Sequence, residues 1–232
     1  MIDINKHKFF MVQILKDIYS DTVLNSLLGF KGGTALMFFY DLPRFSVDLD
    51  FNLLNPEKEK LCYERLRKIV LKYGKIDDEA IKFYGILIVL DYGVNERKLK
   101  IEVSNRLYDN HYEIRNLLGI NVLTMTKEDM FAHKLCALLD RNCITNRDVF
   151  DCWFFMNQKT VVNDSIIKER TGKSVSEYLA ECIESIKARS DKGLLDGLGE
   201  LMNQEMKKFV KTKLYSEFLD LLEFYRIFPI MK

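Results

Sequence analysis

The sequence predicts an α+β fold in two parts, a mixed α/β part followed by an all-helical part. Residues 47–53 and 98–104 alternate between apolar and polar side chains, a pattern typical of half-buried strands. From Thr126 onward, apolar side chains recur at helical spacing to the end of the chain. We therefore expect two domains, residues 1–125 and residues 126–232.

Each segment has a pattern of its own. Apolar side chains at helical spacing predict helices over residues 5–29 and 57–73. Residues 83–92 predict a strand, which we expect to form a hairpin with the next strand, at residues 98–104. Thr126 is followed three positions later by Asp129, a pair typical of a capped helix start.

Composition excludes several classes of protein. The 232 residues include 35 basic and 34 acidic side chains, so no overall positive field attracts nucleic acid and any contact must be local. The apolar fraction of 48% excludes disorder as the main state. Five widely spaced cysteines without a CxxC pair suit a reducing cytoplasm. We see no signal peptide and no apolar stretch long enough for a membrane, and expect a cytoplasmic protein.

A glycine pair, Gly32 and Gly33, separates two apolar segments. Glycine allows a sharp turn and a close approach of the backbone to a ligand. Thr34 and Ala35 can open a helix, whose free N–H groups would bind phosphate. The alternative is an ordinary turn.

Two aspartates, Asp48 and Asp50, share one face of the strand at residues 47–53. Like charges side by side are costly, so a shared divalent cation would explain the pair. The alternative is a solvated strand face. Glu102, on the strand at 98–104, is a candidate third carboxylate, and three converging acids could hold two metal ions. Its alternative is an ordinary surface position.

The helical part contributes cations and further acids. Lys134 and Arg141 are two helical turns apart and share a face, as a triphosphate site requires; the alternative is a pair of snorkelling cations. Asp148 and Asp151 follow a predicted helix start, where acids also favour the helix dipole. Asp148 could orient Lys134 or Arg141, or accept a proton from the acceptor.

Taken together and in this order, the motifs resemble a known family. Residues 31–36 read Lys-Gly-Gly-Thr-Ala-Leu, and residues 44–50 contain Arg44, Ser46, Asp48 and Asp50 at alternate positions. They resemble the minimal nucleotidyltransferase fold, a mixed sheet flanked by helices, and in particular the AbiEii/AbiGii toxin family. The segments at 134–141 and 147–151 also resemble that family's pattern, so the resemblance spans about residues 28–155.

The resemblance implies a metal-dependent transferase that moves a nucleoside monophosphate from a nucleoside triphosphate to an acceptor. It implies that Asp48, Asp50 and Glu102 bind Mg²⁺ or Mn²⁺, and that Lys134 and Asp148 also act in catalysis. The expected nucleotide-binding residues are Gly32, Gly33, Thr34, Arg44, Ser46, Lys134 and Arg141. From the residues alone, Arg44 could meet either a phosphate or Asp41, and Ser46 could bond the phosphate or brace the turn.

Three functions are compatible with these residues. The first is the toxin of a bacterial toxin–antitoxin or abortive-infection system, held in check by a cognate antitoxin, with a tRNA end or a protein hydroxyl as acceptor. The second is a transferase that modifies a small molecule such as an aminoglycoside. The third is a nucleotide-binding module without turnover.

Overall fold

The computed structural model describes residues 3–94, 96–140, 143–189, 193–228 and 230. The chain forms two compact units. The first, here called the sheet unit, comprises Met1–Asp41, Phe45–Leu107 and Tyr112–Met125. The second, the helical unit, comprises Leu42–Arg44, Tyr108–His111 and Thr126–Lys232. The mixed α/β part and the helical part expected from the sequence are both present. The domain limits 1–125 and 126–232 stay a prediction.

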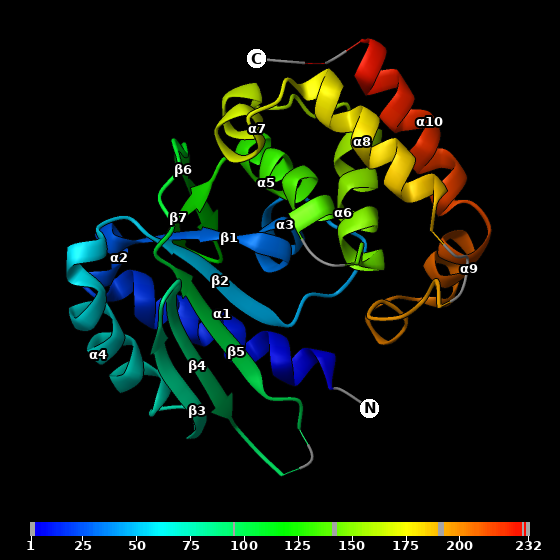
Figure 1. Cartoon of the computed structure of the whole chain (residues 1–232). Helices are drawn as coiled ribbons and strands as arrows, with labels where there is room; N and C mark the ends of the chain where they lie inside the picture. Colours follow the sequence, from blue (N-terminus) through cyan, green and yellow to red (C-terminus); the bar gives the residue numbers. More distant parts are fainter. Residues whose placement is uncertain (1–2, 95, 141–142, 190–192, 229, 231–232) are drawn as a thin grey trace. The chain divides into compact units, whose positions relative to one another are not determined.

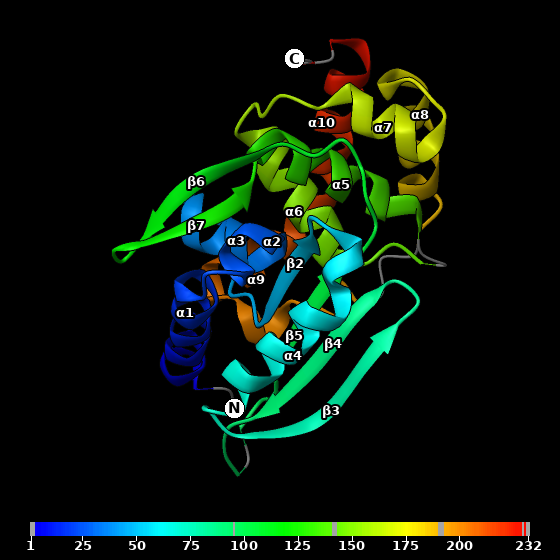
Figure 2. The same ribbon diagram turned by 90° about the vertical axis from the view of Figure 1, so that its left-hand side faces the viewer.

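The sheet unit is built on a seven-stranded mixed sheet with the order β3-β4-β5-β2-β1-β7-β6 (Figure 1). Its strands are β1 (Leu28–Lys31), β2 (Asp48–Leu53), β3 (Lys75–Lys82), β4 (Gly85–Asp91), β5 (Leu99–Ser104), β6 (Tyr112–Leu117) and β7 (Ile120–Met125). The central strand β2 runs antiparallel to β1 and parallel to β5. In Figure 2, β3 and the β6–β7 hairpin mark the two edges of the sheet.

One face of this sheet is apolar and covered. Because side chains alternate along a strand, Leu49 and Phe51 lie on the face opposite to Asp48 and Asp50. Both apolar side chains are fully buried. Their face continues onto β4 and packs against α4, where Ile88 is also fully buried. The acids are therefore placed on the opposite face.

The helices of the sheet unit begin with α1, which Asp3 caps by accepting a hydrogen bond from the N–H of Lys6. They are α1 (Ile4–Ser20), α2 (Leu24–Leu27), α3 (Gly32–Phe39) and α4 (Glu59–Val70), the last preceded by a 3₁₀ turn at Pro56–Lys58. His7 of α1 donates from Nε2 to the carbonyl of Val47 at 2.8 Å and accepts at Nδ1 from the hydroxyl of Tyr92. Burial lowers the pKa of His7, which agrees with this neutral tautomer.

The helical unit contains the helices α5 (Lys127–Asp140), α6 (Asn146–Asn157), α7 (Asp164–Thr171), α8 (Val175–Lys187), α9 (Gln204–Thr212) and α10 (Leu214–Ile227), with a 3₁₀ turn at Gly199–Leu201. The side chains of Thr145, Asn163, Ser174 and Asn203 cap four of these helices. Its core includes a stacked pair, Phe131 and Phe155, with ring centroids 5.0 Å apart.

Several sequence predictions need correction. The helix predicted over residues 5–29 ends at Ser20, because Asp21 adopts an extended conformation and its carboxylate accepts from the N–H groups of Val23 and Leu24. The cap predicted for Thr126 is also wrong: α5 begins directly after this residue, but its hydroxyl has no hydrogen-bond partner in the described part of the chain. Asp129 instead accepts from the backbone N–H of His111.

Among the described residues, no helix has the length and apolar composition needed to cross a membrane.

Candidate active site

Four charged side chains share one face of the sheet at β2 and β5. The two strands are parallel and in register, so that Asp48 is paired with Lys100 and Asp50 with Glu102. Adjacent strands lie about 4.8 Å apart, which makes these side chains direct neighbours. Asp48 and Asp50 are half-buried, whereas Glu102 is exposed. Glu102 thus lies beside the aspartate pair, where the sequence analysis expected a third carboxylate.

Lys100 lies within this acidic group. Its Nζ is 3.2 Å from Oε1 of Glu102. Burial lowers the pKa of Lys100, but the charges of Glu102, Asp48 and Asp50 raise it, and the net shift is upward. The ammonium therefore stays protonated and offsets part of the repulsion among the three acids. The sequence analysis assigned Lys100 no role beside the acids, because the register of β5 against β2 is not visible in a local pattern.

The acidic side chains of β2 and β5 provide few ligands for a metal ion. No group of three His, Cys, Asp or Glu side chains lies close enough to hold a metal ion among the residues that the structure describes. Mg²⁺ usually binds one or two carboxylates and completes its shell with water and substrate phosphates. The half-buried pair Asp48 and Asp50 suits that coordination. The third position predicted for Glu102 stays a prediction, since its carboxylate is paired with Lys100.

The glycine pair is held directly against the acids. Gly32 ends the turn after β1 with φ +81°, a conformation that favours glycine, and it begins α3. A Cβ atom at this position would be 2.5 Å from Oδ2 of Asp50. Thr34, which is fully buried, donates from Oγ1 to the carbonyl oxygen of Asp48 at 2.5 Å. The diglycine bend and the aspartate strand therefore form one fixed assembly.

Two further polar residues extend this face beyond the acids. Lys31, opposite Asp50 in the β1–β2 register, donates from Nζ to Oδ1 of Asn52 at 2.5 Å. Asn52 in turn donates from Nδ2 to the hydroxyl of Tyr112 at 2.8 Å. Sequence reasoning did not assign a role to Lys31 or Asn52. The alternation that placed Asn52 beside the aspartates was the available signal.

Ser46 precedes β2 and is buried in the sheet unit. Its predicted contact with a phosphate stays a prediction.

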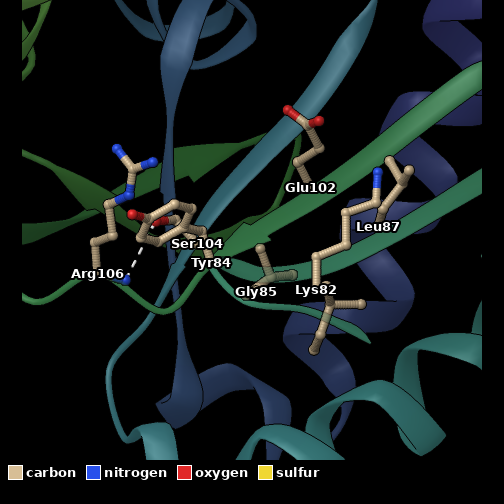
Figure 3. Close-up of a pocket in the computed structure, with 9 residues that line it drawn as sticks. Lys82, Tyr84, Gly85, Leu87, Glu102, Ser104 and Arg106 are labelled. Atoms are coloured by element: carbon tan, nitrogen blue, oxygen red, sulfur yellow. Dashed lines mark hydrogen bonds between the residues drawn. The ribbon is translucent and has the colours of Figure 1, made fainter. Parts of the chain in front are cut away.

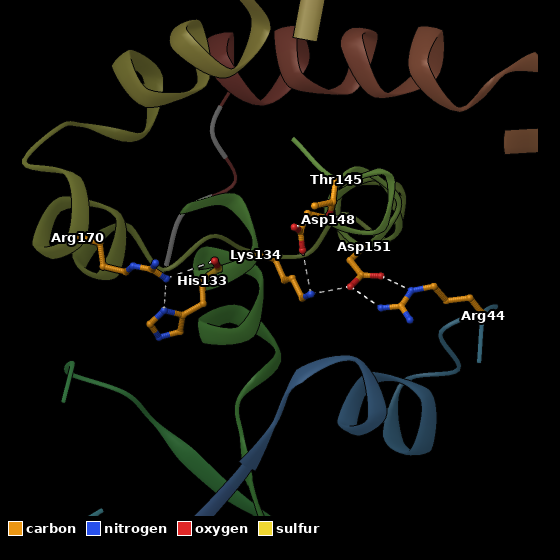
Figure 4. Close-up of polar contacts among 7 residues, drawn as sticks. All are labelled: Arg44, His133, Lys134, Thr145, Asp148, Asp151 and Arg170. Atoms are coloured by element: carbon orange, nitrogen blue, oxygen red, sulfur yellow. Dashed lines mark hydrogen bonds and ion pairs between the residues drawn. The ribbon is translucent and has the colours of Figure 1, made fainter. Parts of the chain in front are cut away.

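The helical unit holds a separate ion-pair cluster, which consists of Arg44, Lys134, Asp148 and Asp151 (Figure 4). Arg44 donates from Nε and Nη2 to the two carboxylate oxygens of Asp151, each at 2.7 Å. Nζ of Lys134 lies 2.8 Å from Oδ2 of Asp151 and 3.3 Å from Oδ1 of Asp148. Thr145 donates from Oγ1 to Oδ2 of Asp148. The cluster therefore pairs two cations with two carboxylates.

The pKa values follow from this pairing. Burial raises the pKa of Asp151, but Arg44 and Lys134 lower it to about 2. Burial lowers the pKa of Lys134, while Asp151 and Asp148 raise it, and the net shift is upward. Asp151 and Lys134 are thus both charged at neutral pH, and the side chain of Lys134 remains partly exposed, at 22%.

These contacts bear on two of the alternatives that the sequence left open, while a proton-accepting role for Asp148 and a phosphate contact of Arg44 stay predictions. Asp148 contacts Lys134, one of the partners that the sequence proposed for it. Arg44 binds Asp151, not Asp41. Asp151, for which the sequence offered a helix-dipole role as an equal alternative, is the centre of the cluster. Arg141, predicted to share a face with Lys134, lies outside the described residues.

A mixed sheet that carries two aspartates beside a glycine-led helix defines a nucleotidyltransferase-like protein. The profile of the family described as "Nucleotidyl transferase AbiEii toxin, Type IV TA system" matches residues 13–224. The chain therefore belongs to the AbiEii family of nucleotidyltransferase toxins. No curated protein matches the chain at a significant level.

Solved structures show the same fold. A candidate nucleotidyltransferase from H. pylori has 20% identity and a TM-score of 0.63, covering 96% of this chain and 94% of its own. The JHP933 protein from Helicobacter pylori has 21% identity and a TM-score of 0.58, covering 97% and 92%. MenT4, a nucleotidyltransferase toxin from Mycobacterium tuberculosis, has 16% identity and a TM-score of 0.57, covering 94% and 84%.

Proposed function

We propose that this chain transfers a nucleoside monophosphate from a nucleoside triphosphate to a hydroxyl group of a macromolecule, an RNA end or a protein, and acts as the toxin of a toxin–antitoxin system. The observation that carries the proposal is the close approach of Gly32 to the carboxylate of Asp50, which leaves no space for a Cβ atom between them. It brings a backbone bend suited to phosphate against the half-buried pair Asp48 and Asp50. Family membership supports the same chemistry.

The reaction exchanges one phosphorus–oxygen bond for another. The acceptor oxygen forms a bond to the α-phosphorus, the bond between the α-phosphorus and the bridging oxygen breaks, and pyrophosphate leaves with the bonding electrons. The hydroxyl proton passes to solvent or a carboxylate. A divalent cation, Mg²⁺ or Mn²⁺, would be held by Asp48 and Asp50 and would neutralise charge on the phosphates.

The remaining groups of the sheet unit bind and position. N–H groups at the start of α3, from Gly32 to Thr34, have no partner within the helix and are suited to hydrogen-bond phosphate oxygens. Thr34 fixes the backbone of Asp48, since it donates to the carbonyl of that residue. Lys100 supplies a positive charge beside the acids.

In the helical unit, we propose that Lys134 binds a phosphate group. Its side chain is partly exposed and its ammonium is held by Asp148 and Asp151, which supports a fixed cation more than a mobile surface lysine. Arg44 uses two donors on Asp151, so we assign it the positioning of Asp151 and, through it, of Lys134. Asp148 also orients Lys134. We place the activity in the cytoplasm, under the control of a cognate antitoxin.

The test incubates the protein with each α-labelled nucleoside triphosphate, Mg²⁺ and either total RNA, cell protein or an aminoglycoside. We expect label in RNA or protein, with release of pyrophosphate, and no transfer after the metal is chelated. Asp48→Asn should abolish both transfer and growth inhibition. Asp78→Asn changes an exposed aspartate of the edge strand β3 and should retain both. A fully active Asp48→Asn variant would refute the proposal.

A further inference from the structure

A cavity of about 270 Å³ lies at one end of the sheet, next to the acidic face (Figure 3). It is formed by the end of β3, the β3–β4 turn, the start of β4 and the end of β5 with the residues that follow it. Its polar lining residues are Lys82, Tyr84, Glu102, Ser104 and Arg106. Its volume is just below the lower end of typical ligand pockets, about 300 Å³, so it suits a group the size of one nucleotide.

Positive charge and an aromatic ring meet at this cavity. The guanidinium carbon of Arg106 lies 4.0 Å from the ring centroid of Tyr84. Tyr84 is 56% exposed and its neighbour Phe83 is 86% exposed. In the described ranges, neither Lys82 nor Arg106 forms an ion pair with a carboxylate. Two uncompensated cations beside an exposed ring form the combination that binds a phosphate backbone and a stacked base.

The walls of the cavity are fixed by backbone contacts. Gly85 has φ +127°, and a Cβ atom there would be 1.9 Å from the carbonyl oxygen of Val103. The backbone N–H of Asn105 donates to the carbonyl of Tyr84 at 3.2 Å. Its side-chain amide donates to the carbonyl of Phe83 at 3.2 Å and to Oε1 of Glu59 at 2.9 Å. These hydrogen bonds of Asn105 therefore hold the turn with Phe83 and Tyr84 against the end of β5.

Glu102 connects the cavity with the candidate active site. It lines the cavity and is also paired with Asp50 in the β2–β5 register. Leu87 is paired with Ala80 of β3 and with Glu102 of β5, and Lys82 lies two positions after Ala80. The side chains of Lys82, Leu87 and Glu102 therefore share the face that carries the aspartates. A ligand bound beside Glu102 in the cavity would therefore lie one strand away from Asp50.

We propose that this cavity binds the single-stranded end of an RNA acceptor. Lys82 and Arg106 contact its phosphates, and Tyr84 stacks on an unpaired base. The inference rests on the proposed function for the fate of the RNA, but the binding itself requires neither metal nor nucleotide. The protein has almost no net charge, so this local pair of cations would supply the electrostatic attraction.

Binding is measured by fluorescence anisotropy with a labelled single-stranded RNA oligonucleotide, in EDTA and without nucleoside triphosphate. The double variant Lys82→Ala/Arg106→Ala should bind at least tenfold more weakly, and the slope of log affinity against log salt should fall by about 1.4, because each lost phosphate contact contributes about 0.7. Lys60→Ala/Lys68→Ala removes two exposed lysines from α4 and should leave affinity and slope unchanged.

The ring is tested separately from the charges. Tyr84→Ala should weaken binding about tenfold, whereas Tyr84→Phe should bind as the parent does, since stacking needs only the ring. A blunt RNA duplex should compete poorly because its bases are already stacked. An oligonucleotide with 4-thiouridine near its 3′ end should crosslink to the segment from Phe83 to Tyr84.

Three results would overturn the inference: parental binding by the double variant, equal weakening by the α4 control, or displacement of the RNA by an equal concentration of free nucleoside triphosphate. Failure of the proposed function is recognised independently. Asp48→Asn should bind RNA as the parent does, because Asp48 does not line the cavity. If that variant still transfers nucleotide, the proposed function fails whatever the binding data show.

Discussion

Gly32 and Asp50 occupy positions that leave no space for a side chain between them: a Cβ atom on Gly32 would be 2.5 Å from Oδ2 of Asp50. Gly32 directly follows β1, and its neighbour Lys31 is paired with Asp50 on the adjacent strand β2. Any ligand that contacts the N–H groups of the bend must therefore also lie close to the aspartate. This relationship makes a glycine necessary at position 32 for two reasons, its positive φ and its contact with the acid.

These two reasons can be separated with Gly32→Ala and Gly119→Ala. Both glycines have positive φ, and a Cβ at Gly119 would meet nothing within 4 Å. Each variant should lose about 1–2 kcal/mol of unfolding free energy from the left-handed conformation. Only Gly32→Ala should also lose nucleotide transfer, by about 100-fold or more, because its methyl group displaces Asp50. Denaturant unfolding and transfer rates measure both effects.

Equal activity loss in both variants would contradict this explanation, since it would trace the loss to stability alone. Retention of activity in Gly32→Ala would show that the contact with Asp50 is not required.

Much of the fold was predictable because it depends on local patterns. The alternation along β2 predicted the buried apolar face, and Leu49 and Phe51 are indeed fully buried, but it did not predict that Asn52 is buried as well. The edge strand β3 was missed because most of its side chains face solvent, so no apolar alternation is visible in Lys75–Lys82. The hairpin of β6 and β7 was also missed. Only Leu117 is buried in Tyr112–Leu117, so β6 has no buried apolar alternation, whereas β7 buries Val122, Thr124 and Met125.

The candidate site was predictable as a set of residue types, but not as a set of contacts. The motif around Gly32 and Asp50 is short enough to be recognised in the sequence. The ion pair between Lys100 and Glu102, by contrast, gains its meaning from a register between strands that are about 50 positions apart. The cluster around Asp151 likewise joins residues more than 100 positions apart, Arg44 and Asp151.

Lys100 provides a second prediction, which concerns the affinity for the metal. Its ammonium offsets negative charge among Asp48, Asp50 and Glu102, as its raised pKa indicates. Lys100→Met should therefore bind Mn²⁺ more tightly. A partly exposed charge of this kind contributes about 1 kcal/mol, which corresponds to about fivefold in affinity. Free Mn²⁺ is measured by electron paramagnetic resonance at pH 7 without nucleotide.

Lys98→Met is the matched control, because Lys98 is exposed and pairs with Asp77 at 2.6 Å. It should bind Mn²⁺ as the parent does. An equal gain in both variants would indicate a general effect of charge, and no gain in Lys100→Met would show that its ammonium does not act on the cation.

Asp151 provides a third prediction, on stability and its pH dependence. Its carboxylate is fully buried and carries the bonds of both Arg44 and Lys134. Asp151→Asn should lower the unfolding free energy by about 3 kcal/mol or more, because it leaves two cations without their common partner. Asp140→Asn breaks an ion pair whose carboxylate is 47% exposed and should cost about 1 kcal/mol or less. Denaturant titration at pH 7 measures both.

The pKa of about 2 gives this contribution a defined pH range. A carboxyl whose pKa is lowered on folding stabilises the protein above its ordinary value of 3.8, and the contribution is lost as pH falls toward 2. The difference in unfolding free energy between the parent and Asp151→Asn should therefore shrink by about 2 kcal/mol between pH 5 and pH 2. A gap between parent and Asp151→Asn that stays constant over this range would show that Asp151 is not held ionised by Arg44 and Lys134, and would remove the reason to regard Lys134 as a fixed cation.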